Sequence, residues 1–551
     1  MNFKNPCTGS SPPEVCAWQR AAASLAAAAA VSHKPTYRHV CCQCSGLESC
    51  PGSRNAWSRR ERVGARQVSI STSGDVDTTY LELSEDDGGA HKFYEITRAG
   101  TQVIVRYGRI GAQGQEQLAG FPTVEKAKAA AAKKIGEKVR KGYAPAVRGG
   151  RSARSVTRRT VSVVASSVRQ HAPVIWRMRT GSTAFGIHVG EDRCWVGNQS
   201  GDVYALAHDG EVLCHYKLPD GVKCLVADDF WIYAGCDDGR VYDLSAKLPH
   251  AAYTIRDDVD IFWLDIRDGA LGVADRDGGL TVIDHEEEFQ WSQRSRGQAA
   301  WMVRCDEDVV YHGHSAGVTA YAAEGGRELW HTATNGNVLF GWQETHSVYA
   351  GTGRNLVQRL AKADGRIEAV YRCDSAVYSC AASPEGKYVF AGDNASSVYC
   401  FTADGIRLWK LGTGCGAALS MQYLDQKLYI VTTDGSMACI DVSEAAITAA
   451  HGGQVPVPVD VKAAAALSTY QPPAQVTALP VAAATGSGVV VECVDEQGRL
   501  RIRVRSTGYQ GDWNVQFPRE YRVAGARYVV DEVVAGNRGF YRIKGEIRRL
   551  V

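Results

Sequence analysis

The stretch "AGCDDGRVYDL", residues 234–244, consists of two short apolar runs joined by a polar turn that contains Asp237, Asp238 and Gly239. This pattern predicts a strand, a tight turn and a second strand, because glycine readily adopts the positive φ that such turns need. Six other stretches repeat it, with turn residues 38 to 41 positions apart: Gly201, Gly239, Gly278, Gly317, Asn355, Ser396 and Gly435. A period of this length holds four short strands, or one propeller blade. Residues 174–443 are therefore predicted to form a seven-bladed β-propeller.

A second set of aromatic residues supports the number of blades. One aromatic recurs in another strand of each repeat: Trp176, Tyr216, Tyr253, Trp291, Trp330, Tyr371 and Trp409. The first precedes the first turn, and none follows the seventh turn. The strand "VIWRMRT" (174–180) is therefore expected to complete the last blade, which would leave no free sheet edge at the seam.

The pieces "GDVYALAHDGEVL" (201–213) and "GGRELW" (325–330) resemble the repeats of quinoprotein-like propellers. The array also resembles WD-repeat propellers, although the Trp-Asp dipeptide is absent. Pyrroloquinoline quinone enzymes of the first type usually have eight blades, a signal peptide and a calcium site. The sequence shows no such set, so we expect no cofactor and no metal, and a quinoprotein-like oxidoreductase remains a remote alternative.

Several aromatic and histidine residues of the array have two interpretations. Trp263, Trp301, Phe340 and Tyr378 open the innermost strands, where they either surround one mouth of the channel or pack between blades. His312 and His314 in "YHGHSAG" could share one strand face, but two histidines do not make a metal site. We expect them to be turn and core residues.

Residues 79–143 are predicted to form a compact α+β unit. The segments "YLEL" (80–83), "HKFYEITR" (91–98) and "TQVIVRYG" (101–108) alternate as strands. The segment "TVEKAKAAAAKKIGEKVRKGY" (123–143) is predicted to be a helix that begins after an N-cap at Thr123 and ends at Gly142.

This unit resembles the WGR domain through "KFYEI" (92–96), "VRYGRIGAQGQ" (105–115) and the closing "RKGY" (140–143). Tyr107 replaces the Trp of the family motif, whereas Gly108 and Arg109 are present. WGR domains occur in poly(ADP-ribose) polymerases, where the motif helps to hold a DNA strand end, and in bacterial proteins of poorly known role. The resemblance implies that Tyr107 stacks on a sugar or base, that Gly108 allows close backbone approach, and that Arg109 reaches phosphate or ribose.

The expected nucleic-acid site extends beyond the motif itself. In the WGR-like unit it adds the basic residues Lys92, Arg106, Lys133 and Lys134. Residues 486–551 are predicted to form a basic β-rich C-terminal domain in which Arg499, Arg501, Arg503 and Arg505 share one strand face. Arg501, Arg503 and Trp513 are the candidate nucleic-acid contacts there, and a β unit with a wet basic face is the alternative.

The remaining segments have low-complexity composition. Residues 1–78 are predicted to be a disordered extension, and a zinc site at His39, Cys41, Cys44 and Cys50 is disfavoured because a second CxxC is missing. Residues 144–173 are predicted to be a basic linker with six Arg and no acid, and residues 444–485 an Ala/Pro-rich linker.

Charge and cysteine usage limit the possible functions. The net charge is +2, but residues 174–443 hold 37 acidic and 23 basic residues, so a polyanion is attracted to the flanking parts and repelled by the propeller. Most of the 17 Cys are scattered singly in apolar runs, as in a cytoplasmic protein with reduced thiols. No apolar run is long enough to span a membrane, so a membrane partner is not expected.

Two functions remain open. The first is a non-enzymatic adaptor, which is cytoplasmic and associated with the nucleoid or nucleus. In it the WGR-like unit contacts DNA, including strand ends, and the acidic propeller recruits an unknown protein. The alternative is a purely protein-binding scaffold. No phosphate-binding loop, nucleophile elbow or paired carboxylates point to an enzyme.

Overall fold

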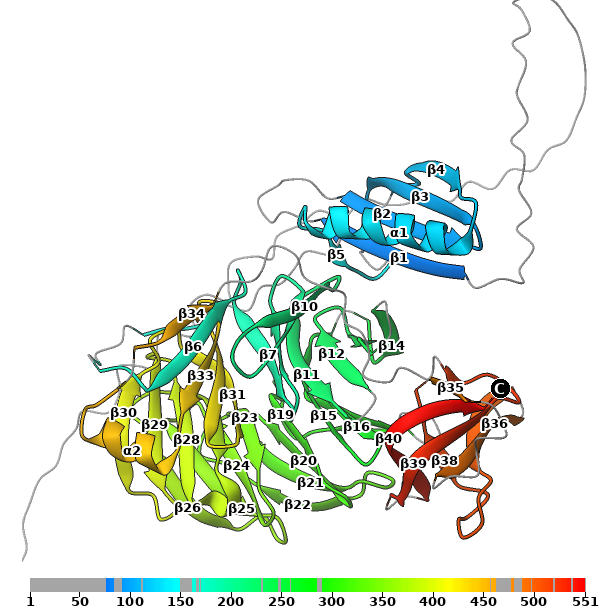
Figure 1. Cartoon of the computed structure of the whole chain (residues 1–551). Helices are drawn as coiled ribbons and strands as arrows, with labels where there is room; N and C mark the ends of the chain where they lie inside the picture. The colour runs from blue at the N-terminus through cyan, green and yellow to red at the C-terminus, as the bar shows by residue number, and fades with distance from the viewer. Residues whose placement is uncertain are drawn as a thin grey trace, which may run out of the picture. The chain divides into compact units, whose positions relative to one another are not determined.

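The structure is a computed structural model with a mainly β, multidomain architecture (Figure 1). It describes residues 76–83, 92–110, 112–148, 161–164, 168, 170–228, 231–245, 249–257, 259–284, 290–455, 457–461, 477–479, 488–496, 498–518, 521–536 and 539–550. The disfavoured zinc site at 39–50 lies outside these residues. No helix in the described ranges is long and apolar enough to cross a membrane.

The first folded unit is a five-stranded antiparallel sheet covered on one face by a helix (Figure 1). The strand order is β4-β3-β2-β1-β5. The strands are β1 (Val76–Leu83), β2 (Lys92–Ala99), β3 (Gln102–Arg109), β4 (Gln115–Gly120) and β5 (Ala144–Pro145). The unit therefore extends beyond the predicted limits at both ends: β1 includes three residues assigned to the disordered extension, and β5 starts the predicted basic linker. Both additions arise from pairing, because Val76 aligns with Ala99 and Pro145 with Leu81.

Helix α1 (Val124–Val139) begins where the sequence predicts but ends three residues before the predicted Gly142, with its C-cap at Arg140. The Thr123 side chain accepts a hydrogen bond from the backbone N of Lys126 at 3.3 Å, and Glu125 lies in the first turn, where the helix dipole favours an acid. Gly142 has a φ of +85°, the left-handed conformation expected just beyond a helix. Ala127 and Ala131 are the buried contacts of α1 with the sheet.

Within the described residues, seven sheets make a β-propeller, as predicted. The inner strands β7, β11, β15, β19, β23, β27 and β31 contact one another in sequence, and β31 contacts β7, so the ring is closed. The strands are β7 (Ala184–Val189), β8 (Cys194–Asn198), β9 (Asp202–Leu206), β10 (Val212–Lys217), β11 (Val222–Ala227), β12 (Ile232–Cys236), β13 (Arg240–Asp243), β14 (His250–Thr254), β15 (Ile261–Arg267), β16 (Ala270–Asp275), β17 (Gly279–Asp284), β18 (Gln290–Arg294), β19 (Met302–Cys305), β20 (Val309–His314), β21 (Gly317–Ala322), β22 (Glu328–Thr332), β23 (Val338–Gln343), β24 (Ser347–Thr352), β25 (Leu356–Ala361), β26 (Ile367–Arg372), β27 (Val377–Ala382), β28 (Tyr388–Asp393), β29 (Ser397–Thr402), β30 (Arg407–Gly412), β31 (Ala418–Leu424), β32 (Lys427–Thr432) and β33 (Ser436–Asp441).

The repeated turns have the geometry that the sequence alignment predicts. All seven turn residues have positive φ, including the two that are not glycine, Asn355 at 63° and Ser396 at 56°. A side chain at the end of the preceding strand closes several of these turns. In one, Asp393 Oδ1 accepts from the backbone N of Ala395 and of Ser397 at 3.0 and 2.9 Å. Local hydrogen bonding of this kind explains why the propeller turns are rich in Asp.

Four residues of the aromatic ladder join neighbouring blades through hydrogen bonds. Trp176 Nε1 donates to the carbonyl oxygen of His208 at 2.8 Å, and Trp330 Nε1 donates to that of Lys362 at 3.0 Å. The Trp291–Ala323 and Tyr371–Ala403 pairs repeat this contact at 2.8 and 3.0 Å. Each bond links an outer strand to the next blade over 32 residues of sequence. The ladder therefore marks the interfaces between blades.

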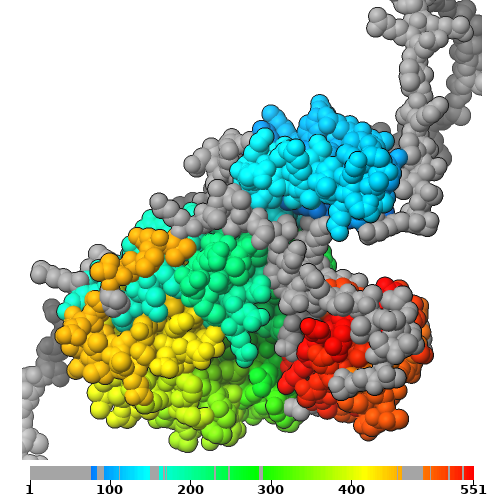
Figure 2. Space-filling view, in the orientation of Figure 1, coloured from blue at the N-terminus to red at the C-terminus, as the bar shows by residue number. Residues whose placement is uncertain are grey.

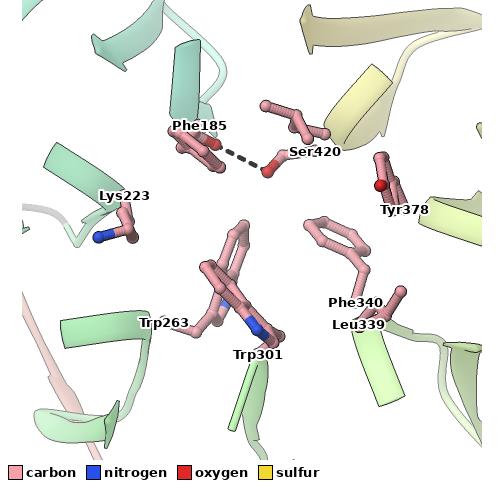
Figure 3. A pocket seen from close by; sticks show the side chains of 9 residues that line it. Phe185, Lys223, Trp263, Trp301, Leu339, Phe340, Tyr378 and Ser420 are labelled. Carbon is pink, nitrogen blue, oxygen red and sulfur yellow. Dashed lines mark hydrogen bonds between the residues drawn. The ribbon is translucent and has the colours of Figure 1, made fainter. Parts of the chain in front are cut away.

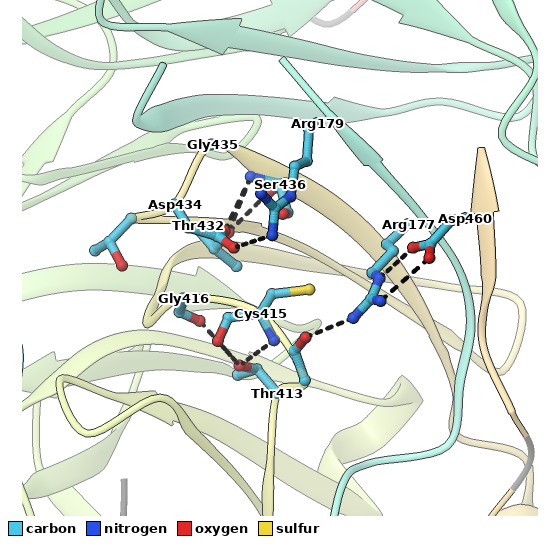
Figure 4. Close-up of polar contacts among 12 residues, drawn as sticks. Arg177, Arg179, Thr413, Cys415, Gly416, Thr432, Asp434, Gly435, Ser436 and Asp460 are labelled. Atoms are coloured by element: carbon cyan, nitrogen blue, oxygen red, sulfur yellow. Dashed lines mark hydrogen bonds and ion pairs between the residues drawn. The ribbon is translucent and has the colours of Figure 1, made fainter. Parts of the chain in front are cut away.

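The last blade is completed by a strand that comes before the first blade in the sequence. Strand β6 (Val174–Arg179) lies beside β33, as the sequence predicts, with Trp176 opposite Cys439. Figure 4 shows the side chains at this seam: Arg177 Nη1 donates to the carbonyl oxygen of Gly414 at 2.7 Å, and Arg179 lies 3.7 Å from Asp434. Gly435 is required there, because a Cβ would lie 2.4 Å from the carbonyl oxygen of Ser182.

The predicted linker 444–485 contains ordered structure, which corrects that prediction. Helix α2 (Glu444–His451) buries Ile447 and Ala450 in an apolar cluster formed by the sixth and seventh blades. Strand β34 (Val459–Val461) pairs in parallel with β6, and Figure 2 shows the two segments adjacent on the propeller surface. Strand β35 (Thr477–Leu479) pairs with β40 of the C-terminal unit. The helix had a local signal, because Ser443 caps it by accepting from the backbone N of Ala446 at 3.2 Å.

The C-terminal unit is a small closed barrel. Strand β36 (Val489–Glu496) pairs with β37 (Arg499–Val504), which pairs with β38 (Asn514–Gln516). Strand β40 (Phe540–Leu550) pairs with β38 and with β39 (Arg527–Ala535), and β39 returns to β36. This closure leaves no open edge among the five strands, and the enclosed core contains Val491, Ile502, Tyr528 and Ile543. The predicted β-rich domain is confirmed.

The two histidines of "YHGHSAG" have the structural roles expected for them. His314 Nδ1 accepts from the backbone N of Ala316 at 3.2 Å and so closes a turn, whereas His312 is 0% exposed in the core. Burial, and next the neighbouring His314, lowers the pKa of His312 to about 3. The folded state therefore holds this ring neutral.

Acid is expected to destabilise the propeller through His312. Its pKa in the folded protein lies below the unfolded value of about 6.5, so its stabilising contribution is present above that pH and is lost as the pH falls. The loss is about 1.4 kcal/mol per pH unit, or roughly 2 kcal/mol at pH 5. Urea unfolding at pH 7.5 and pH 5 should show that His312→Leu loses less stability on acidification than the wild type does. The exposed His346→Gln variant is the control, and parallel losses in all three proteins would contradict the prediction.

Candidate nucleic-acid interface

Tyr107, the aromatic residue of the motif, lies on the helix-covered face of the first sheet. Strand alternation places Val103, Val105 and Tyr107 on this face, where they pack with Tyr94 of β2. The Tyr107 and Tyr94 rings are stacked with centroids 5.9 Å apart, and Tyr107 Oη accepts from Gln117 Nε2 at 3.1 Å. The Tyr107 ring is half-buried, so a nucleotide would meet a ring that is already held in place.

Positive side chains surround this tyrosine pair. Arg109 is exposed and lies opposite Lys92 in the β2–β3 pairing, next to the Tyr94–Tyr107 pair on the same face. Lys138 of α1 places Nζ 4.1 Å from the Tyr94 ring centroid and 5.3 Å from that of Tyr143. Lys134 is one helical turn before Lys138. We call Lys92, Tyr94, Tyr107, Arg109, Lys134 and Lys138 the basic tyrosine surface.

The lysines of this surface are close enough to affect one another. Desolvation lowers the pKa of Lys138, and the charges of Lys141, Lys134 and Lys92 lower it further. Like charges held together in this way lose repulsion when an anion binds between them. A phosphate backbone is therefore a favourable partner for the surface.

Arg106 and Gly108 lie on the face of β3 opposite to Tyr107 and Arg109. Arg106 Nη2 lies 3.3 Å from Glu95 Oε2, and Arg148 Nε lies 2.9 Å from the same oxygen. A Cβ at Gly108 would lie 2.8 Å from Gly114 Cα and 3.3 Å from Phe93. Gly108 thus lets the following loop pack on Phe93, which is a structural reason for glycine in the motif. The structure does not bring Arg106 together with Tyr107 and Arg109.

Lys133 and Lys134 point in different directions from α1. Adjacent helical residues are about 100° apart around the axis, and Lys133 is exposed whereas Lys134 is half-buried. Lys134 therefore belongs to the basic tyrosine surface and Lys133 does not. Lys138 and Tyr94 were not among the predicted site residues, although the alternation in "KFYEI" and the spacing of four between Lys134 and Lys138 could have indicated them.

The arginines of the C-terminal barrel are largely paired with acids. Arg503 Nε donates to Glu496 Oε1 at 2.9 Å, and Arg505 Nε donates to Glu492 Oε2 at 2.7 Å. Arg501 is only 8% exposed. Trp513 is half-buried, with its ring centroid 5.0 Å from that of Tyr541. The barrel therefore places its candidate contacts in a less positive setting than the basic tyrosine surface does.

The channel of the propeller has two different mouths. Trp263, Trp301, Phe340 and Tyr378 line the one where the inner strands begin, so this interpretation of the four aromatics holds (Figure 3). Two of them also serve blade packing, because the Arg304 guanidinium lies 5.4 Å from the Trp263 ring and 5.7 Å from that of Phe340. The other mouth opens into a cavity of about 230 Å³ lined by residues that include His188, Asp265 and Gln343.

The thiols of the propeller are protected from reaction. All but one of the free cysteines in the described residues are buried, and Cys415 is half-buried. Burial raises the pKa of Cys194, Cys224 and Cys415, so the thiolate form needed for nucleophilic chemistry is disfavoured.

Comparison with known proteins identifies two families along the chain. Residues 77–150 match the WGR domain family. Residues 314–510 match the family described as outer membrane protein assembly factor BamB, whose repeats are PQQ-like. The chain therefore fuses a WGR domain to a propeller with PQQ-like repeats, as the sequence predicts. No curated protein matches the chain.

Two solved structures are similar to part of the chain. The WD40 β-propeller domain of Doa1 has 11% sequence identity to this chain and a TM-score of 0.44. The match covers 50% of this chain and 98% of the Doa1 domain. The computationally designed Ika8 protein has 13% identity and a TM-score of 0.40, and the match covers 50% of this chain and 100% of Ika8.

Proposed function

We propose that this fusion protein is a non-enzymatic, nucleic-acid-associated adaptor. Its WGR domain contacts DNA, with a preference for strand ends, and its acidic propeller recruits a protein partner. The observation that carries the proposal is the basic tyrosine surface, where four cations surround a stacked tyrosine pair. Guanidinium and ammonium groups bind phosphate, and aromatic rings stack on bases without sequence preference.

The charge distribution supports a division of roles between the domains. The propeller segment 174–443 has an excess of 14 acidic over basic residues, from 37 and 23. At physiological salt this excess repels phosphate over a Debye length of about 8 Å. The propeller is therefore suited to protein partners, and the protected thiols support a role without nucleophilic catalysis. A cytoplasmic, nucleoid- or nucleus-associated location would follow from DNA binding.

Arg109→Ala should reduce the salt dependence of DNA binding by the full chain. Loss of one phosphate contact should flatten the slope of log K against log salt by roughly 0.9 on duplex DNA. Arg109→Lys should restore binding poorly, because the forked guanidinium geometry is lost. Tyr107→Ala should weaken binding by about 1–3 kcal/mol with little change in slope, and Tyr107→Trp should hold or improve affinity.

Lys138→Ala tests the basic tyrosine surface in the same measurement, and Lys133→Ala is its matched control. Both remove a lysine from α1, but only Lys138 belongs to the basic tyrosine surface. Lys138→Ala should weaken DNA binding, and Lys133→Ala should not. Linear duplexes should compete better than closed circles if strand ends are preferred. Absence of salt-dependent binding to any nucleic acid would overturn the adaptor proposal and leave a protein-binding scaffold.

A further inference from the structure

The propeller builds a cup at the mouth where its inner strands begin. In six inner strands the ladder is interrupted by a bulge at the second residue, and these residues are Phe185, Lys223, Phe262, Leu339, Tyr378 and Leu419. A bulge redirects a side chain out of the regular alternation. Five of these six residues, all except Phe262, line this mouth. Trp263, Trp301 and Phe340 line it with them (Figure 3).

A short segment of the linker between the WGR domain and the propeller is seated on this cup. Val161 packs with Phe185, Tyr378 and Leu419 in one apolar cluster. Two hydrogen bonds to backbone atoms of the segment hold it in place. Tyr378 Oη donates to the carbonyl oxygen of Ser162 at 2.7 Å, and the backbone N of Val164 donates to the carbonyl oxygen of Asn394 at 2.9 Å.

The contacts describe how the cup recognises a peptide. One β-branched side chain enters the apolar cluster, while the bonds from Tyr378 and to Asn394 use only backbone atoms of the segment. Val163, by contrast, does not belong to this cluster, and it is 50% exposed. Because backbone hydrogen bonds tolerate different side chains, any extended segment with a β-branched residue at the first position can make the same contacts.

Charge adds a second element of recognition. The propeller segment 174–443 holds 37 acidic and 23 basic residues and is therefore negatively charged as a whole. The linker 144–173, by contrast, contains six Arg and no acidic residue. An extended basic segment is therefore attracted to the propeller before its apolar residue docks.

We propose that this mouth is a peptide-binding site for an extended segment with a β-branched apolar residue and basic flanks. Residues 161–164 occupy the site in cis, and a partner protein that presents such a segment binds by displacing them. The inference rests on the proposed recruitment of a protein by the propeller, whose partner it describes. It is independent of the DNA contacts of the WGR domain.

A labelled peptide of residues 154–169, "RSVTRRTVSVVASSVR", tests the site by fluorescence anisotropy with the full chain. In the wild type the tethered segment competes at high effective concentration. Val161→Asp in the chain removes this competitor, so it should bind the peptide at least about 10-fold more tightly than the wild type does. Val163→Asp adds the same charge at an exposed position and should bind as the wild type does.

Two further arms make the result decisive. A peptide that carries Val161→Asp should not bind the Val161→Asp chain, and Tyr378→Phe in that chain should weaken binding of the unmodified peptide several-fold. Equal binding of both peptides would show attraction by charge alone and overturn the inference. Equal behaviour of the Val161→Asp and Val163→Asp chains would overturn it as well. Salt-dependent DNA retention by the same chains reports separately on the proposed adaptor role.

Discussion

Deletion of residues 174–180, which contain β6, is expected to prevent the propeller from closing. The deletion removes Val174, Trp176 and Met178, whose side chains are 1–2% exposed. Truncating one buried side chain of this size typically costs 2–5 kcal/mol, so the combined loss should be at least about 5 kcal/mol. That is comparable with the whole stability of a typical domain, about 5–15 kcal/mol.

The deletion also exposes backbone groups that are paired in the intact protein. Strand β33 loses its partner along Ser436–Ile440, and β34 loses the strand to which it is parallel. An unpaired edge of this length promotes aggregation. Calorimetry and size-exclusion chromatography should therefore show a much lower melting temperature or aggregated protein.

Deletion of 151–157 provides a control of equal length in the linker. It should leave the melting of the propeller unchanged, because these residues precede the seam strand. Unchanged melting of the 174–180 deletion would contradict the proposed role of β6 in closing the ring.

The propeller could be predicted because each blade repeats the same turn and the same aromatic position in the sequence. The turn at Gly239 and its six counterparts need positive φ, and the aromatics represented by Trp176 bind the next blade. Both requirements restrict residue type at fixed spacing, so both are visible in the sequence. By contrast, β34 and β35 are three-residue strands whose existence depends on partners far along the chain.

The candidate site was predicted less completely because neighbours in sequence do not always share a face. Arg106 is adjacent to Tyr107, yet strand alternation turns it towards Glu95 on the other side of the sheet. The β36–β37 register sets Glu492 opposite Arg503, and the acids of β36 neutralise the arginines of the barrel. The seating of Val161 on the propeller has no local signal, because the cup assembles from four blades.

Lys223→Met is expected to destabilise the propeller by about 3–5 kcal/mol, because it removes the buried cation that pairs with two buried carboxylates. Lys223 is 1% exposed and pairs with Asp237 and, at 3.1 Å, with Asp260. Burial raises the pKa of Asp237, and the charge of Lys223 opposes this rise. Removal of the lysine should raise the pKa further, so the folded variant favours the protonated acid.

The loss of stability should therefore depend on pH in a defined direction. A carboxyl whose folded pKa is raised contributes stability at low pH and loses it as the pH rises through the folded value. Urea unfolding of Lys223→Met should show a larger loss at pH 8 than at pH 5.5, and adding Asp237→Asn should recover part of it. The exposed pair of Lys387 and Glu444 gives the matched control, since its lysine is 58% exposed. Lys387→Met should cost no more than about 1 kcal/mol, and an equal cost for both variants would show that Lys223 is not needed to neutralise the mouth of the channel.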